Sequence, residues 1–260
     1  MRVLDSLLEF FNISGFILTC LIFVPLERVI TLHKAQRVLR RWWWNDLIYV
    51  FVNRIFITAG LVLFMVGVGA SASRLVPADL KSAVAGQPTW LQVVQIILVA
   101  DVWFYTLHRL FHTVPWLWKF HAIHHSIVEL DWLAAARVHP LDQIVTKGMS
   151  VWLCYVLGYT GVSIGISAGI YAWHSILLHA NVRMNFGPLR WLIASPQFHH
   201  WHHANQPDAR NKNYAGQLSI LDKLFGTLYM PEGQTPTIYG VEEPVPDTYM
   251  AHLLYPFKRR

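Results

Sequence analysis

The chain has 260 residues, of which 54% are hydrophobic and only 14% are charged. Soluble domains carry about 25% charged residues, so this composition, with a mean hydropathy of +0.35, excludes an ordinary soluble protein. The net charge of +6 does not indicate a nucleic-acid partner, because the lysines and arginines flank apolar segments, as expected for attraction to anionic lipid headgroups. We therefore expect an integral membrane protein whose surroundings are membrane lipids.

One domain is expected over residues 1–260, because no linker and no shift in composition divides the chain. The two cysteines, Cys20 and Cys154, both lie in apolar runs, where a thiol behaves as a small hydrophobic group. No disulfide framework is predicted. The N-terminus carries acidic residues before its apolar run and no small-residue cleavage site follows, so a cleaved signal peptide is not expected.

Three apolar segments within about residues 10–107 predict transmembrane helices. The first runs from about Phe10 to Val24 and either stops at Pro25 or extends past it. The second and third are expected over Leu47–Gly69 and Trp90–Leu107. The first histidine motif lies at the end of the third segment.

The loops between these segments predict the orientation of the chain. The stretch Arg28–Arg41 is the most basic in the sequence and is followed by three tryptophans, a pattern typical of a cytoplasmic membrane boundary. The loop Ala70–Thr89 is poor in charge and is expected on the outer side. Arg54, about two turns into the second segment, either extends to the headgroups or lines the interior.

Residues 108–148 and 180–230 are predicted to form a cytosolic metal-binding cap, and 231–260 a C-terminal tail. Between the two parts of the cap, residues 149–179 predict an apolar helical hairpin with helices at Met149–Tyr159 and Val162–His179. This hairpin must return to its starting side, because the histidines before and after it have to meet. The expected fold is all-α: a multi-pass membrane helical bundle with a cytosolic, histidine-rich cap that holds two metal ions, in a bacterial inner membrane or the endoplasmic reticulum.

Twelve of the fourteen histidines lie between His108 and His203, in the patterns HxxxH, HxxHH, isolated positions, and HHWHH. On a helix, His108 and His112 project from one face, and each HxxHH pattern brings a pair three residues apart within reach of a common point. Imidazole nitrogen suits iron, zinc or copper, and three such clusters offer too many ligands for one ion. The sequence therefore predicts two metals.

The order of these motifs, with the flanks DVWFYTLHRLFH, RVHPLD, LHAN and LDKLFGT, resembles the fatty acid hydroxylase and sterol desaturase superfamily of membrane di-iron oxygenases over about Asp101–Met230. The segment Asn211–Gly216 departs from the pattern DKNYG of many members. The resemblance implies two Fe ions, which Zn can replace on overproduction. Carried over motif by motif, it implies that nine histidines are the ligands: His108, His112, His121, His124, His125, His179, His199, His202 and His203.

Four further residues are candidates either for binding metal or for holding a ligand in place. They are His139, which matches a recurring family position, His200, which should point away from its neighbours and face outward, Asp101 and Asp222. Asp101 lies two turns before His108, and it either accepts the outer N–H of a ligand histidine or is paired with Arg54 or with a hydroxyl group. His174 is left out, because it is five residues from His179 and the two diverge on a regular helix.

The resemblance implies an O2-dependent oxidoreductase that hydroxylates or desaturates a lipid C–H bond. Its electrons would come from a separate reductase, ferredoxin, cytochrome or pterin. The alternative class is a membrane zinc protein, either a transporter or a hydrolase. A transporter needs an exit path on both sides, whereas these clusters lie at segment ends that face one side. A hydrolase needs a carboxylate base beside its ligands, and the sequence contains no HExxH motif.

Overall fold

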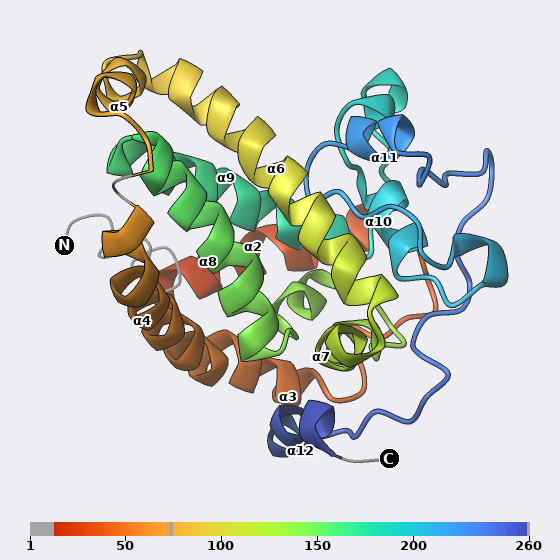
Figure 1. Ribbon diagram of the computed structural model, residues 1–260. Helices are drawn as coiled ribbons and strands as arrows, with labels where there is room; N and C mark the ends of the chain where they lie inside the picture. The colour runs from red at the N-terminus through yellow and green to blue at the C-terminus, as the bar shows by residue number, and fades with distance from the viewer. Residues whose placement is uncertain (1–12, 73–74, 259–260) are drawn as a thin grey trace.

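The computed structural model describes residues 13–72 and 75–258, and the regular elements in this part of the chain are all helical (Figure 1). Its only β-type pairings are two isolated bridges. This confirms the predicted all-α class. Residues 10–12 of the first predicted segment, Arg74 of the predicted outer loop and the last two residues of the predicted tail lie outside the described residues.

Five long helices make up the bundle: α2 (Ile13–Val29), α4 (Arg54–Ala72), α6 (Thr89–Thr113), α8 (Pro140–Leu157) and α9 (Gly161–His179). Shorter elements are α3 (Trp43–Ile48), η1 (Tyr49–Asn53), α5 (Ala78–Ala85), α7 (Pro115–His125), η2 (Trp132–Ala136), η3 (Gly187–Trp191), α10 (Pro196–His202), η4 (Pro207–Ala209), α11 (Ile220–Leu224), α12 (Tyr249–Leu254) and η5 (Tyr255–Phe257). Within the described residues, three helical stretches are long and apolar enough to cross a membrane: Trp43–Val68, Thr89–Thr113 and Gly161–His179.

The first helix, α2, continues through Pro25 and ends at Val29. Proline removes one backbone hydrogen bond and would normally end or kink a helix. Here the turn beyond it is anchored, because the buried Glu27 carboxylate accepts N–H groups from both Trp132 and Asn181, each at 2.8 Å. Of the two alternatives for this segment, the structure therefore has the one that extends past the proline.

The second predicted segment begins four residues early, at Trp43, and runs through α3, the π-helical η1 and α4. Its polar residue Asn53 is fully buried and hydrogen-bonded. Its side-chain N–H donates to the carbonyl of Val138 at 2.8 Å, and its oxygen accepts from the Tyr249 hydroxyl at 3.1 Å. Arg54 lines an internal cavity that is described below.

The predicted hairpin starts nine residues earlier than expected, because α8 begins at Pro140 rather than Met149. Pro140 occupies the first helical turn, and the ring of His139 caps it by accepting the N–H of Leu141 at 3.1 Å. The helix ends at Gly158, where φ is +92° and an added Cβ would lie 2.7 Å from the Lys81 backbone. Only glycine suits both conditions.

The basic loop before α3 is tied into the fold. Arg40, expected with its neighbours to face lipid headgroups, is instead buried and forms ion pairs with Asp46 and with Asp131, the latter at 2.8 Å. Arg137 also pairs with Asp46. This network joins the loop to the segment that follows α7, so part of the basic charge is structural.

The helices meet at one end of the bundle. In Figure 1, α6 runs diagonally across the molecule from α5 at one end to α7 at the other, and α10 and α11 lie beside its second half. α6 packs against α7, α8 and α9, while α9 packs against α10. The ends of α6, α7 and α9 and the whole of α10 are thereby brought together, and these are the segments that carry the histidine motifs.

Candidate metal centre

Nine histidines form two groups at this end of the bundle. In each group the ring nitrogens lie within 4.8 Å of one another. All nine are the residues expected as ligands from the motifs, although the sequence did not predict how they divide. The first group is His108, His112, His121, His125 and His202, and the second is His124, His179, His199 and His203.

Helical periodicity explains the division. Residues four apart share a face of a helix, whereas adjacent residues point about 100° apart. In α7, His121 and His125 therefore point into the first group and His124 into the second. The same rule at α10 sends His199 and His203 to one group and His202 to the other.

Five of the nine rings are fixed by hydrogen bonds from Nδ1 to an oxygen of the protein. The acceptors are the Asp142 carboxylate for His121 (2.7 Å) and backbone carbonyls for the others: Tyr214 for His108 (2.6 Å), Arg137 for His124 (3.0 Å), Ser175 for His179 (2.7 Å) and Lys212 for His202 (2.9 Å). An oxygen acceptor requires the proton on Nδ1, so Nε2 carries the lone pair. Each of these rings presents the nitrogen form that binds a metal.

The Nε2 atoms face one another across short distances. They are 2.9 Å apart for His108 and His121 and 3.1 Å apart for His124 and His179. Because all four of these rings hold their proton on Nδ1, neither pair can form a hydrogen bond, and the opposed lone pairs repel. Two nitrogens bound at right angles to one ion, each at about 2.1 Å, lie about 3.0 Å apart. The spacing and the donor set thus fit a metal ion in each group.

Burial favours the uncharged form of His202 and His203. It lowers the pKa of His202 to about 3, and it lowers the pKa of His203 well below the usual value, with neighbouring imidazoles adding to the effect. Neutral imidazole is the form that coordinates metals. These two rings, one from each group, are therefore in the form that can bind a cation.

Asp142 is a functional candidate that the sequence analysis missed. It lies in the first turn of α8 and is buried, and its Oδ2 accepts the N–H of His121. A carboxylate in this position orients the ring and raises its basicity as a ligand. Asp142 could have been found from its place in the motif RVHPLD, but the sequence interpretation selected His139 of that motif instead.

Asp101 does neither of the things expected of it. Its carboxylate accepts three backbone N–H groups, from Gly216 (2.9 Å), Gln217 (3.0 Å) and Leu218 (2.7 Å), and neither a histidine nor Arg54 nor a hydroxyl group. Asp222 accepts the N–H groups of Tyr214 and Ala215 and the Thr227 hydroxyl. Both acids lie outside the two groups. They hold the loop whose Tyr214 carbonyl fixes His108.

Three other histidines also lie outside the groups. His139 caps α8, and its Nε2–H donates to the Leu253 carbonyl at 3.3 Å. His200 points away from its neighbours but does not face outward. It is fully buried, donates to the Ala180 carbonyl at 2.9 Å and accepts from the Tyr239 hydroxyl at 2.8 Å. His174 donates to the Ala194 carbonyl at 2.8 Å.

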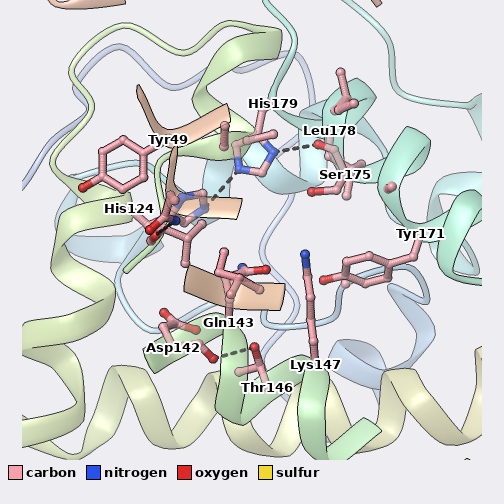
Figure 2. A pocket seen from close by; sticks show the side chains of 18 of the residues that line it. Tyr49, His124, Asp142, Gln143, Thr146, Lys147, Tyr171, Ser175, Leu178 and His179 are labelled. Carbon is pink, nitrogen blue, oxygen red and sulfur yellow. Dashed lines mark hydrogen bonds between the residues drawn. The ribbon is translucent and has the colours of Figure 1, made fainter. Parts of the chain in front are cut away.

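Two spaces open onto the histidines. A largely apolar cavity of about 190 Å³ lies among α2, η1, α4, α6, α8 and α9 (Figure 2), and it is reached by His108 and His121 from the first group and by His124, His179 and His199 from the second. A polar pocket of about 340 Å³ reaches His112, His125, His202 and His203 and includes the Arg210–Glu242 ion pair. The centre is thus accessible from an apolar and from a polar space.

Known proteins that are similar to this chain are lipid and sterol hydroxylases or monooxygenases. The chain is 29% identical over 265 residues to ornithine lipid hydroxylase OlsE of Rhizobium tropici, covering 98% of this chain and 78% of that protein. It is 31% identical over 164 residues to alkylglycerol monooxygenase of Homo sapiens, covering 60% of this chain but only 34% of that protein. It is 28% identical over 138 residues to methylsterol monooxygenase 1 of Gallus gallus, covering 50% of this chain and 43% of that protein. No solved structure matches the chain.

The family model for fatty acid hydroxylase matches residues 93–227. This range is more than half of the 260 residues, and it contains both histidine groups and Asp142. The chain belongs to the fatty acid hydroxylase family of oxidoreductase enzymes.

Proposed function

We propose that this enzyme is a membrane di-iron oxygenase that inserts oxygen from O2 into a C–H bond of a lipid. The observation that carries the proposal is the pair of all-imidazole groups at the inner end of an apolar cavity. A cavity of this kind admits a hydrocarbon chain and excludes water from the reacting carbon. Two metal sites beside an apolar space suit the oxidation of a hydrocarbon chain.

In the proposal, the five-histidine and four-histidine groups each hold one iron ion, and bound iron would supply the activation of O2 and the removal of hydrogen from an unactivated carbon. The chain supplies everything else. Asp142 and the backbone carbonyls aim the nitrogens, and the apolar side chains of α2, α6 and α9 that line the cavity position the substrate. Zn can replace iron when the protein is overproduced.

The number of imidazoles favours iron over the zinc alternative. Structural zinc is almost always four-coordinate and tetrahedral, whereas the first group offers five nitrogens. A zinc hydrolase would also need a carboxylate base in reach. Asp142, the one carboxylate among the described residues that line the cavity, is already bonded to His121.

The relatives support a lipid substrate and favour hydroxylation over desaturation. Their names specify an ornithine lipid hydroxylase, an alkylglycerol monooxygenase and a methylsterol monooxygenase. We infer that the substrate is likewise a lipid that enters the cavity from the membrane. Electrons from a separate reductase, ferredoxin, cytochrome or pterin would reach the histidines through the polar pocket.

The test is oxidation by purified protein. Protein from iron-replete cells should hold about two iron ions per chain. With a chemical or enzymatic electron source, it should transfer one atom of ¹⁸O2 into a lipid, detected by mass spectrometry of extracted membrane lipids. A freshly prepared, folded protein with one metal or fewer, or oxidation products without label, would contradict the proposal.

We also propose that the chain crosses the membrane several times with the metal centre on the cytosolic side. Ser82 on α5 and Asp208 on η4 are exposed and lie far apart, Ser82 at the end away from the histidines. A cysteine at position 82 should therefore react with a membrane-impermeant thiol reagent added outside intact cells, and one at position 208 should not. The opposite labelling pattern would place the metal centre outside.

A further inference from the structure

Besides the histidines, three polar side chains project into the apolar cavity. Gln143 and Lys147 lie four residues apart on one face of α8, and Tyr171 extends from α9 (Figure 2). Lys147 is about 7.5 Å along α8 from Asp142, and Tyr171 is about 12 Å along α9 from His179, at 1.5 Å per residue. The cavity therefore has a metal-facing part and a polar part.

None of these three polar groups has a partner in the described part of the chain. No hydrogen bond or ion pair is formed there by the Lys147 ammonium, the Gln143 side-chain amide or the Tyr171 hydroxyl. The remaining polar groups around the cavity are already engaged. Asp142 accepts from His121, and the Tyr49 hydroxyl is bonded to His252 at 2.7 Å.

Lys147 is exposed along this cavity and forms no hydrogen bond there, and charged groups among membrane helices mark binding sites or ion pathways. The Asp142 carboxylate, which lines the same cavity, accepts from His121 through Oδ2 and forms no hydrogen bond with the Lys147 ammonium among the described residues. An ammonium, an amide N–H and a phenolic O–H are together suited to a group with several acceptor oxygens and a negative charge.

We propose that Lys147, together with Gln143 and Tyr171, binds a carboxylate or phosphate of the lipid substrate. This rests on the proposed function, since it assumes that the cavity holds the substrate. A lipid held by its anionic group at this position would extend its chain along the cavity toward the histidines that line it. The anchor would thus select both the class of lipid and the carbon that reacts.

The test compares the binding of three single-chain probes to the purified metal-loaded protein in neutral detergent, without O2 or reductant. Hexadecanoic acid and hexadecyl phosphate carry the two anionic groups, and hexadecanol is the neutral control. The protein should bind at least one of the anions about tenfold more tightly than the alcohol. A preference for the acid alone assigns a carboxylate, and a preference for the phosphate alone assigns a phosphate headgroup.

Variants distinguish anion binding by Lys147, Gln143 and Tyr171 from anion binding by the metal ions. Lys147→Met, of similar length, should lose the preference, and Lys147→Arg should keep most of it. Lys223→Met, which removes an exposed lysine from α11, should bind like the parent protein. If Lys147→Met does not fold, Tyr171→Phe and Gln143→Met take its place. Each should weaken binding of the preferred anion severalfold and leave hexadecanol binding unchanged.

Equal binding of all three probes by the parent protein would overturn the anchor, and so would an anion preference that survives Lys147→Met or both replacement variants. Because no turnover is needed, the outcome is independent of the oxygenase proposal. Selective anion binding by a protein that oxidises no lipid would contradict only the proposed function. Oxidation of lipids by a protein without anion preference would contradict only the anchor.

Discussion

The two histidine groups differ in the number of rings that hydrogen bonds hold in place. In the first group, three of the five rings are fixed through Nδ1, one of them by the Asp142 carboxylate. In the second, His124 and His179 are fixed by carbonyls, whereas the buried Nδ1 atoms of His199 and His203 have no partner. Fewer ligands and fewer fixed rings imply a metal site that is weaker and easier to rearrange.

The groups also face different surroundings. Three of the four members of the second group line the apolar cavity, while three of the five members of the first line the polar pocket. The less constrained group thus lies toward the proposed substrate, where ligands must come and go. We infer that the first group is the permanent anchor of the centre and the second is its adaptable part.

The largest effect is expected from removing a member of the second group. His179→Ala should leave three imidazoles, reduce the metal content from about two ions to about one, and lower hydroxylation more than about 100-fold, because loss of a ligand exceeds the usual cost of losing a neighbour that orients one. Metal analysis of folded protein and product formation measure both quantities.

The matched control is His200→Ala, since His200 is buried beside this group but bonds only to Ala180 and Tyr239. It should keep both metals while lowering the free energy of unfolding by about 1–3 kcal/mol, because the Ala180 carbonyl loses its donor. Equal metal retention in the two variants would show that His179 is not a ligand.

A smaller effect is expected at the first group from Asp142→Asn. The amide can still accept from His121 but carries no charge, so the affinity of this group for its metal should fall about 10–100-fold. Competition with a chelator of known affinity measures the change. Asp101→Asn is the comparison, because it affects the same group only through the 214–218 loop. It should lower stability more than metal affinity, and the reverse ranking would contradict the assigned roles.

The smallest effect is a difference in rate between the two sites of the unaltered protein. Release of metal into excess chelator should have two phases, with the second group emptying about tenfold faster than the first, because it has fewer ligands and no carboxylate behind them. The His179→Ala protein should show only the slow phase. A single phase in the parent protein would remove the distinction between the groups.

The sequence predicted the identity of the clustered histidines but not their division. Motif spacing and family resemblance named all nine, whereas the split into five and four depends on how α6, α7, α9 and α10 cross. The residues that fix the rings were missed for a similar reason. Four of the five acceptors are carbonyls or carboxylates ten or more residues from their histidine, and backbone carbonyls leave no mark in a sequence.

The predictions for the start of α8 and for Asp101 were wrong for physical reasons. The first turns of α8, which carry Asp142, Gln143 and Lys147, were expected in the cytosolic cap, since polar residues usually face water. In the structure these three residues line the apolar cavity, with Asp142 buried and Lys147 exposed. Asp101 was assigned to a side-chain partner because carboxylates in membrane helices usually pair with one. Three backbone N–H groups of a distant loop satisfy it instead.

The order of the motifs along the chain has a consequence for biosynthesis. Once residue 125 has left the ribosome, the nascent chain already contains four of the five members of the first group, but only His124 of the second. The second group is incomplete until His179 at the end of α9 and then His199 and His203 have been synthesised. His203 lies 78 residues after His125. Domains generally fold as units during and after synthesis. For a chain expected to form one domain, neither group is complete before His202 joins the first and His199 and His203 join the second, so a chain stalled before α10 cannot assemble the proposed pair of metal sites.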